Sequence, residues 1–175
     1  MKSIAKPEAG YPSFYQPYLS KVPGDGELLK HLEEIMDETE KLARHLTEPE
    51  LYFRYSEGKW TIKDIFLHLA DCERIIIYRA LRIARADKTE LPGFDEDLFA
   101  REAHAGKREV QDIISELSAF RRASILFIES LDEEALGRSG RANGFDLTVR
   151  LLVNHLYGHH RHHLDIIYSK YLRRS

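Results

Sequence analysis

Apolar residues recur at helical spacing in four segments of the chain, residues 27–46, 61–86, 108–131 and 147–172. Steps of three and four residues between apolar positions place these side chains on one face of a helix, so each segment predicts an amphipathic helix. No segment shows a convincing alternation of the kind that a half-buried strand has. Four long helices in one chain predict an all-α fold, a four-helix bundle.

The segments between the predicted helices supply the start and stop signals. Thr61 and Asp64 have the spacing of a capping box that opens the second helix. Residues 87–97 combine charged residues, a Pro-Gly turn and the acidic cluster Asp95, Glu96 and Asp97. The spacing of a calcium-binding loop is missing there, so a solvated crossover is expected. Residues 137–144 predict a turn-rich connection, and the bundle is expected to have a long crossover connection.

Residues 1–24 differ in composition from the rest of the chain. They hold Pro7, Pro12, Pro17 and Pro23 with Tyr11, Phe14, Tyr15 and Tyr18 between them. This is too much proline for a helix and too many aromatic rings for a free tail. We predict an extended N-terminal arm over residues 1–24 and one bundle domain over residues 25–175. Two placements of the arm remain open, as a bridge to a second subunit or as a cover on its own bundle.

Composition excludes several classes of protein. A length of 175 residues suits one domain with a substantial core. A net charge of −3 with both signs interspersed offers no basic face, so no nucleic-acid partner is expected. No stretch reaches the length of a signal-peptide core or a membrane span, so no membrane association and a cytoplasmic location are expected. The single cysteine, Cys72, excludes an internal disulfide and a thiolate metal cluster.

The candidate chemistry lies in histidines. Five of the nine histidines fall within residues 154–167. His155, His159 and His163 are four residues apart and therefore share one side of the fourth helix. The apolar line of that helix runs through His159 and His163, whereas His160 and His162 point away from it. His31 and His45 lie on charged faces of the first helix and are given no metal role.

A third imidazole is expected from the second helix, where His68 adjoins the apolar line. His68, His159 and His163 are the predicted metal ligands, and His155 is the reserve if the helix phase is shifted. Three imidazoles with one open position are typical of a catalytic metal site. Imidazole also binds iron and copper and the sequence does not select among the metals, but zinc or nickel is expected first.

Other polar residues near His68 are weaker candidates. Asp64 and Asp71, about one turn to either side, are candidates to hold that imidazole or to take a proton, with a surface role as the alternative. Arg79, Arg82 and Arg85 extend the same helix. They are candidates to meet an anionic group of a substrate, with ordinary solvated charge as the alternative.

Three motifs in this order carry a resemblance to a known family. They are residues 60–65 followed by His68-Leu69-Ala70-Asp71, residues 87–96 with their Leu-Pro-Gly-Phe-Asp-Glu core, and residues 154–164. Together they resemble the DinB/YfiT-like superfamily of small bacterial metal-binding four-helix bundles, over about residues 26–172. The resemblance places the histidine triad of that family on His68, His159 and His163.

The resemblance also implies a function. It implies an enzyme that acts on a small molecule with a metal-activated, low-molecular-weight thiol, a thiol-dependent transferase or a related hydrolase, and it implies a homodimer. The alternative is a non-catalytic metal-binding or stress-associated dimeric bundle. An open coordination position reached by a pocket favours the enzyme, whereas a closed site favours the alternative.

Overall fold

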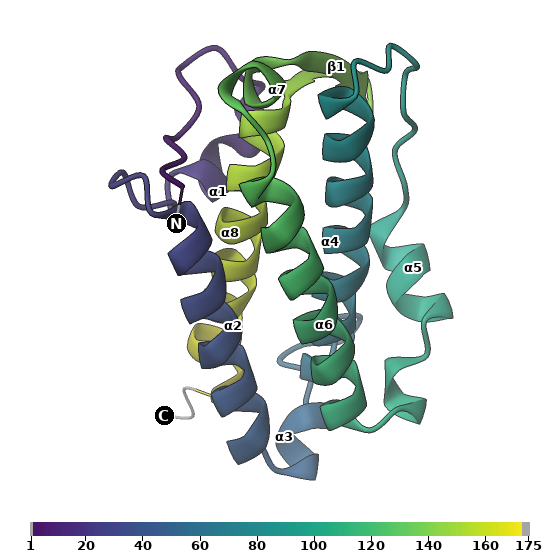
Figure 1. Cartoon of the computed structure of the whole chain (residues 1–175). Helices are drawn as coiled ribbons and strands as arrows, with labels where there is room; N and C mark the ends of the chain where they lie inside the picture. Colours follow the sequence, from purple (N-terminus) through teal and green to yellow (C-terminus); the bar gives the residue numbers. More distant parts are fainter. Residues whose placement is uncertain (1, 173–175) are drawn as a thin grey trace.

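The computed structural model describes residues 2–172 and confirms the predicted bundle (Figure 1). Its long helices are α2 (Leu28–His45), α4 (Ile62–Ala84), α6 (Val110–Glu129) and α8 (Val149–Ile166). α4 and α8 each pack against two neighbours, since α4 contacts α6 and α8, and α8 contacts α2 and α4. α4 and α6 run in the same direction in Figure 1, so the segment between them must return along the length of the bundle. This return is the predicted long crossover.

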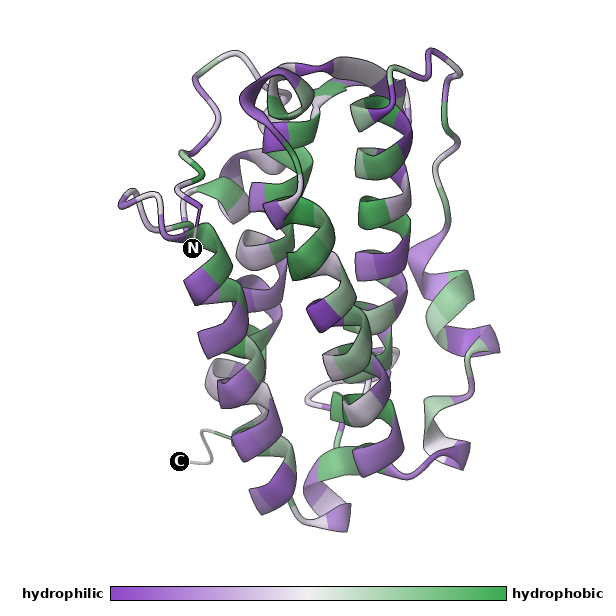
Figure 2. Cartoon of the chain, in the orientation of Figure 1, coloured by the Kyte–Doolittle hydropathy of each residue, from purple (hydrophilic) through white to green (hydrophobic). Residues whose placement is uncertain are grey.

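Apolar residues of the four helices form the buried core, and Figure 2 shows hydrophobic and hydrophilic residues alternating along each of these helices. Phe66 and Leu69 of α4 and Ile113 and Leu117 of α6 are buried in the half of the core that surrounds the N-terminal part of α4. The predicted capping box at the start of α4 is present. The Thr61 N–H donates to Asp64 Oδ2 at 2.8 Å, and the Asp64 N–H donates to Thr61 Oγ1 at 3.1 Å. The cap fixes where α4 begins and hence the phase of its inward face.

Several short elements lie between the long helices. They are α3 (Glu48–Tyr52), α5 (Glu96–Glu102), η2 (Ala105–Lys107), α7 (Glu133–Gly137), and η3 (Ile167–Leu172), a π-helical segment that continues α8. Each has seven residues or fewer, which is at most about two turns. A single turn is too short for the hydrophobic period to be visible, which is why the sequence pattern predicted only the long helices.

A β-hairpin occupies the connection that was predicted to be only turn-rich. Strands β1 (Ser139–Ala142) and β2 (Phe145–Thr148) pair antiparallel, with Ser139 opposite Thr148. Asn143 and Gly144 form the turn with φ of 52° and 77°. An Asn-Gly pair with positive φ at both residues is the preferred two-residue hairpin turn. The expectation of no strands was therefore wrong at this point, because strands of four residues are too short to show a clear alternation.

The crossover after α4 is more ordered than a solvated loop. The Leu91 N–H donates to the Arg141 carbonyl, and the Asn143 N–H donates to the Leu91 carbonyl, both at 2.9 Å. The acidic cluster that follows begins a helix, because Asp95 Oδ1 accepts from the Leu98 N–H at 2.9 Å and caps α5. Carboxylates are favoured at a helix N-terminus, which accounts for the acidic residues there.

The N-terminal arm lies on the bundle and is not extended throughout. It contains η1 (Ser13–Tyr15) and α1 (Gln16–Leu19), and α1 packs on α8. The closest approach is at Gly158 of α8, where an added Cβ would lie 2.2 Å from the Tyr18 carbonyl oxygen. A glycine in mid-helix costs about 1 kcal/mol relative to alanine. Its presence here is explained by the arm, which needs the space that a side chain would fill.

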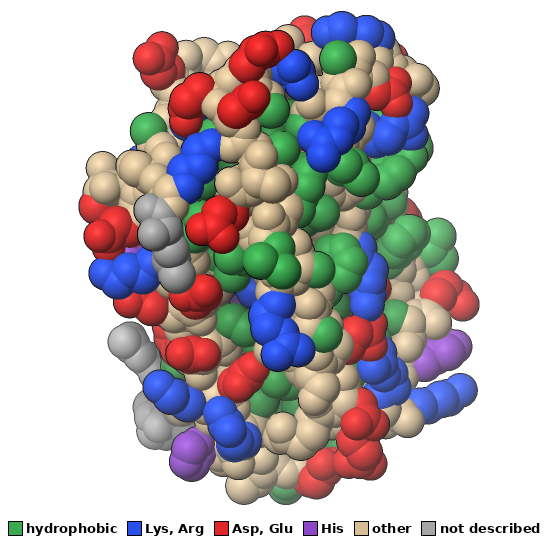
Figure 3. All heavy atoms as spheres, viewed as in Figure 1, with side chains coloured by type: hydrophobic (Ala, Val, Ile, Leu, Met, Phe, Trp, Pro, Cys, Tyr) green, Lys and Arg blue, Asp and Glu red, His purple; other side chains and the backbone are tan. Residues whose placement is uncertain are grey.

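Acidic and basic side chains are interspersed on the face of the molecule seen in Figure 3. The face in that view therefore carries no large basic patch. Within residues 2–172, no helix combines the length and the apolar character that crossing a lipid bilayer requires.

Candidate metal centre

Three imidazoles from two helices meet inside the bundle. His68 comes from α4, and His159 and His163 come from successive turns of α8. The Nε2 atom of His159 lies 3.2 Å from Nε2 of His68 and 3.1 Å from Nε2 of His163. The rings of His68 and His163 are 4.9 Å apart between centroids. The structure thus brings together the three residues that the sequence selected.

These imidazoles are held in the neutral form. Burial lowers the pKa of His68 to about 4. Burial and then the neighbouring His163 lower the pKa of His159 well below its ordinary value, and burial and then His68 do the same for His163. All three rings are therefore neutral near pH 7, which is the state in which imidazole binds a metal.

The distances between the three nitrogens can be compared with those of a metal site. Bonds of about 2.0–2.1 Å to a tetrahedral zinc ion separate two ligating nitrogens by about 3.3 Å. The observed separations of 3.2 and 3.1 Å lie close to that value. Two of the three separations within the triad thus match those of a zinc site, and neutral imidazole nitrogens are donors that suit a divalent ion.

Cys72 lies beside the triad and was not predicted there. Its Sγ is 3.4 Å from Nε2 and 3.5 Å from Nδ1 of His68, and His68, Cys72 and His159 form a compact group of candidate ligands. These near-equal distances place the sulfur beside the ring of His68, whereas His159 approaches the Nε2 atom of that ring. Burial strongly raises the pKa of the Cys72 thiol. The four-residue spacing from His68 on one helix was the signal that could have indicated its position.

His155, the reserve ligand, lies one turn before His159. The centroids of these two rings are 5.4 Å apart, and the rings of Tyr15 and Tyr18 pack edge-on against His155 at 4.9 and 4.8 Å. Nδ1 of His155 is buried and has no hydrogen-bond partner. The structure therefore places His155 against the arm and next to the triad.

His160 is buried in a polar network on the other side of α8. Its Nδ1 accepts from Nη2 of Arg121 at 3.1 Å, and its Nε2 lies 2.8 Å from the Thr39 hydroxyl, which donates to the Ile35 carbonyl. Arg121 in turn donates to both carboxylate oxygens of Glu73, at 2.8 Å each. The network joins all four long helices and explains this histidine as a structural residue that the sequence pattern left unassigned.

The two carboxylates that were candidates to assist His68 have other partners. Asp64 caps α4 and also accepts from Arg54 at 3.3 Å. Asp71 accepts from Arg74 at 3.2 Å, and burial raises its pKa. Among residues 2–172, neither carboxylate is hydrogen-bonded to an imidazole of the triad. A role of Asp64 or Asp71 in catalysis stays a prediction.

Aromatic rings cover the triad on two sides. Trp60 lies 4.6 Å from the ring of His68 and is stacked on His163 at 6.3 Å, and Tyr18 of the arm lies 5.7 Å from His159. A small cavity of about 60 Å³ adjoins the centre and is lined by His155, His159 and Cys72 among others. The triad is thus enclosed by rings, with a cavity on one side.

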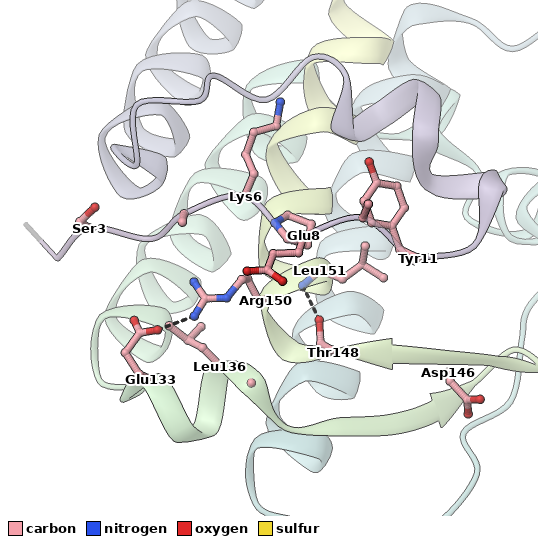
Figure 4. Close-up of a pocket in the computed structure, with 15 residues that line it drawn as sticks. Ser3, Lys6, Glu8, Tyr11, Glu133, Leu136, Asp146, Thr148, Arg150 and Leu151 are labelled. Carbon is pink, nitrogen blue, oxygen red and sulfur yellow. Dashed lines mark hydrogen bonds and ion pairs between the residues drawn. The ribbon is translucent and has the colours of Figure 1, made fainter.

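A larger hollow lies elsewhere on the molecule, and Figure 4 shows the residues that line it. It has a volume of about 600 Å³ and lies between the arm and the end of the bundle that carries α7 and the hairpin. Its charged side chains include Arg150, which is paired with Glu133. Histidine and cysteine are absent from its lining residues, so the hollow offers none of the soft ligands of the triad.

The fold and the triad together define a four-helix bundle with a candidate three-histidine metal centre. The model of the DinB superfamily matches residues 31–167, and the chain belongs to that superfamily. This confirms the resemblance that the sequence motifs carried.

Two known proteins are similar to the chain, one in sequence and one in fold. A protein of Oceanobacillus iheyensis that bears the provisional name of metal-dependent hydrolase is 28% identical over 141 residues, which is 79% of this chain and 80% of that protein. YfiT from Bacillus subtilis, described as a probable metal-dependent hydrolase with an unusual four-helix bundle topology, superposes with a TM-score of 0.77. The superposition covers 97% of this chain and 93% of YfiT at 16% sequence identity, and shows that the two share a fold.

Proposed function

We propose that the protein is a metal-dependent enzyme, and that Nε2 atoms of His68, His159 and His163 hold its divalent ion, zinc or nickel. The observation that carries the proposal is the position of His159 Nε2, which lies 3.2 Å from Nε2 of His68 and 3.1 Å from Nε2 of His163. The names given to the two relatives support a metal-dependent activity. Three neutral ligands leave the charge of the ion intact, and the donor set leaves one position of a tetrahedral ion open.

The proposed reaction uses that open position on a small-molecule substrate. A divalent ion held there would lower the pKa of a water or of a low-molecular-weight thiol and supply a nucleophile near neutral pH. Hydrolysis agrees with the names of the relatives, and thiol transfer agrees with the resemblance noted from the sequence motifs. Trp60 and Tyr18 restrict the access of bulk water to the triad, which strengthens electrostatic interactions inside the site.

Metal content tests the proposal. Protein purified without a histidine tag should contain one divalent ion per chain by elemental analysis. Alanine in place of His68, His159 or His163 should weaken metal affinity by at least about 100-fold, since even partners outside the ligand shell contribute about 10–100-fold. His162→Ala is the matched control, because this histidine lies on the same helix and outside the meeting point of the triad. Unchanged metal content in His68→Ala would refute the ligand set.

Turnover is tested separately with the metal-loaded chain. Activated esters and electrophiles paired with bacterial thiols cover the two proposed reactions. The activity should disappear with a chelator and return with zinc or nickel. Metal binding without turnover on either panel would favour a non-catalytic bundle.

A second function has one observation in its favour, the position of Cys72. If its thiol joined the three histidines, the donor set would have four members, and structural zinc sites are closed in that way. A protein of that kind would bind metal without turnover, which corresponds to the non-catalytic metal-binding bundle named as the alternative above. The sulfur lies beside the ring of His68 and not at its Nε2 corner, which favours the open site.

A further inference from the structure

The small cavity beside the triad extends between α4 and α8 toward the hairpin. It has a volume of about 60 Å³. The residues that line it include His159 and Cys72 at the end near the triad, and Arg79, Phe94 and Asn143 near the hairpin. The cavity thus connects the candidate metal centre with a buried arginine.

Arg79 is buried without an acidic partner. Its side chain is 7% exposed, and its Nη2–H donates to the Pro92 carbonyl at 2.7 Å. A guanidinium has five N–H donors. Within residues 2–172, no carboxylate forms an ion pair with Arg79, whereas the other buried arginine, Arg121, is paired with Glu73 at 2.8 Å. Buried charges are ordinarily paired, so a guanidinium that lines a cavity without an ion pair favours the binding of an anion there.

His155 is a second buried polar group in the same cavity without a partner. It is 7% exposed, and its Nδ1 makes no hydrogen bond. Burial, followed by the charge of Arg79, lowers its pKa to about 3, so the ring is neutral. A neutral imidazole offers one donor or one acceptor to a polar group of a ligand. Among the described residues, a buried guanidinium without an ion pair and an imidazole nitrogen without a partner thus line the same cavity from facing helices, which favours a binding site over a packing gap.

The order of residues along α4 sets the direction of the cavity. His68, Cys72 and Arg79 lie on one face of the helix, and the eleven residues from the first to the last rise by about 16 Å. The cavity follows this face, with His159 and Cys72 among its lining residues at one end and Arg79 at the other. A small molecule in the cavity can therefore meet the triad with one end and Arg79 with the other.

We propose that Arg79 binds a carboxylate of the substrate, with the unpartnered Nδ1 of His155 as a hydrogen-bonding partner, while the reacting end of the molecule lies at the triad. This rests on the proposed function. A single guanidinium and a cavity of about 60 Å³ suit a singly charged carboxylate. A doubly charged phosphate would need more positive charge than the lining supplies, and Glu96 also lines the cavity.

The test compares thiols that differ only at the far end. Zinc-loaded full-length protein is titrated calorimetrically with ω-mercaptocarboxylates and with mercaptoalcohols of the same chain lengths. The carboxylate should bind about tenfold more tightly at the best length, because an ionic hydrogen bond contributes about that factor. Arg79→Gln should remove this preference and leave mercaptoalcohol binding unchanged, which shows that the fold and the metal centre are intact. Arg79→Lys should retain part of it.

Arg85→Gln is the matched control, because it removes the same charge from the exposed end of the same helix segment. It should leave the preference intact. A preference that survives in Arg79→Gln, or equal binding of both thiols by the wild type, overturns the proposal.

Failure of the proposed function would be recognised separately. If the chain binds no metal, plain alkanoates are titrated into the metal-free protein. Binding that Arg79→Gln weakens about tenfold and Arg85→Gln does not would support the carboxylate site, and no binding would overturn it. Tighter binding of alkyl phosphates than of alkanoates would overturn the assignment to a carboxylate.

Discussion

At the scale of single residues, the chemistry of the centre depends on the contrast between three imidazoles and one thiol. Nε2 of His159 lies close to Nε2 of both His68 and His163, whereas Cys72 Sγ lies nearly equidistant from both nitrogens of His68. The helical period predicts which histidines face the core, because a buried polar side chain on the apolar line of a helix needs a hydrogen-bonding or metal partner. It does not predict that the Cys72 thiol lies beside them, because a buried cysteine on the apolar line is indistinguishable by pattern from a small apolar residue.

The role of Cys72 can be measured directly. Cys72→Ser keeps the size of the side chain and removes the soft ligand. We expect zinc affinity to change by less than about tenfold, against at least about 100-fold for His68→Ala, because the open site has three imidazole ligands. Competition with a chromophoric chelator gives both affinities. A loss in Cys72→Ser as large as in His68→Ala would mean a closed, four-ligand site.

At the scale of helices, the triad is positioned by contacts that lie behind it. α8 carries His159 toward α4, and the adjacent His160 faces the other way into the Arg121–Glu73 pair. The sequence predicted both helices and the phase of their inward faces. It did not reveal the buried ion pair, since a charge that faces the core is recognised only when its partner on another helix is known.

Removing one member of this pair should be more harmful than removing both. Glu73→Gln leaves the buried Arg121 guanidinium without a countercharge and should lower the free energy of unfolding by about 3–5 kcal/mol. Glu73→Leu combined with Arg121→Met leaves His160 Nδ1 without its donor, at about 1–3 kcal/mol, while the Leu32 carbonyl that Arg121 also served lies inside α2 and keeps its helical hydrogen bond. Urea unfolding of the metal-free proteins measures both.

The comparison is informative in either direction. A double variant that is more stable than Glu73→Gln supports a pair whose main effect is to avoid an isolated charge. Equal or greater destabilisation in the double variant would show that Arg121 contributes chiefly through its bonds to Leu32 and His160.

At the scale of the whole molecule, the site depends on segments that are far apart in the sequence. The arm covers α8 at Tyr18, and Leu91 of the crossover pairs with Ala142 at the end of β1. The bundle itself follows from the apolar pattern of four helices. The hairpin and the packing of the arm do not, since short strands and a proline-rich segment carry little periodic signal and are fixed by tertiary contacts.

The contacts of the N-terminal arm bear on the state of association. The resemblance to small bundles predicts a homodimer, and that stays a prediction. Within one chain the arm buries Ile4, Tyr15 and Leu19 against its own bundle. Deleting residues 1–20 should therefore lower the melting temperature by about 10 °C, from the loss of several buried apolar side chains. It should leave the number of chains per particle in sedimentation unchanged, because the lost contacts are intramolecular.

Gly158→Ala provides a matched variant of full length. Its added Cβ would lie 2.2 Å from the Tyr18 carbonyl oxygen, so α1 must move away from α8 although the arm is still present. We expect a smaller drop in melting temperature than in the truncated chain and the same mass as the wild type. A shift from dimer to monomer in both variants would show that the arm bridges two subunits. A dimer that persists in both would place the interface on the helices of the bundle, since displacing the arm then leaves the contact between subunits intact.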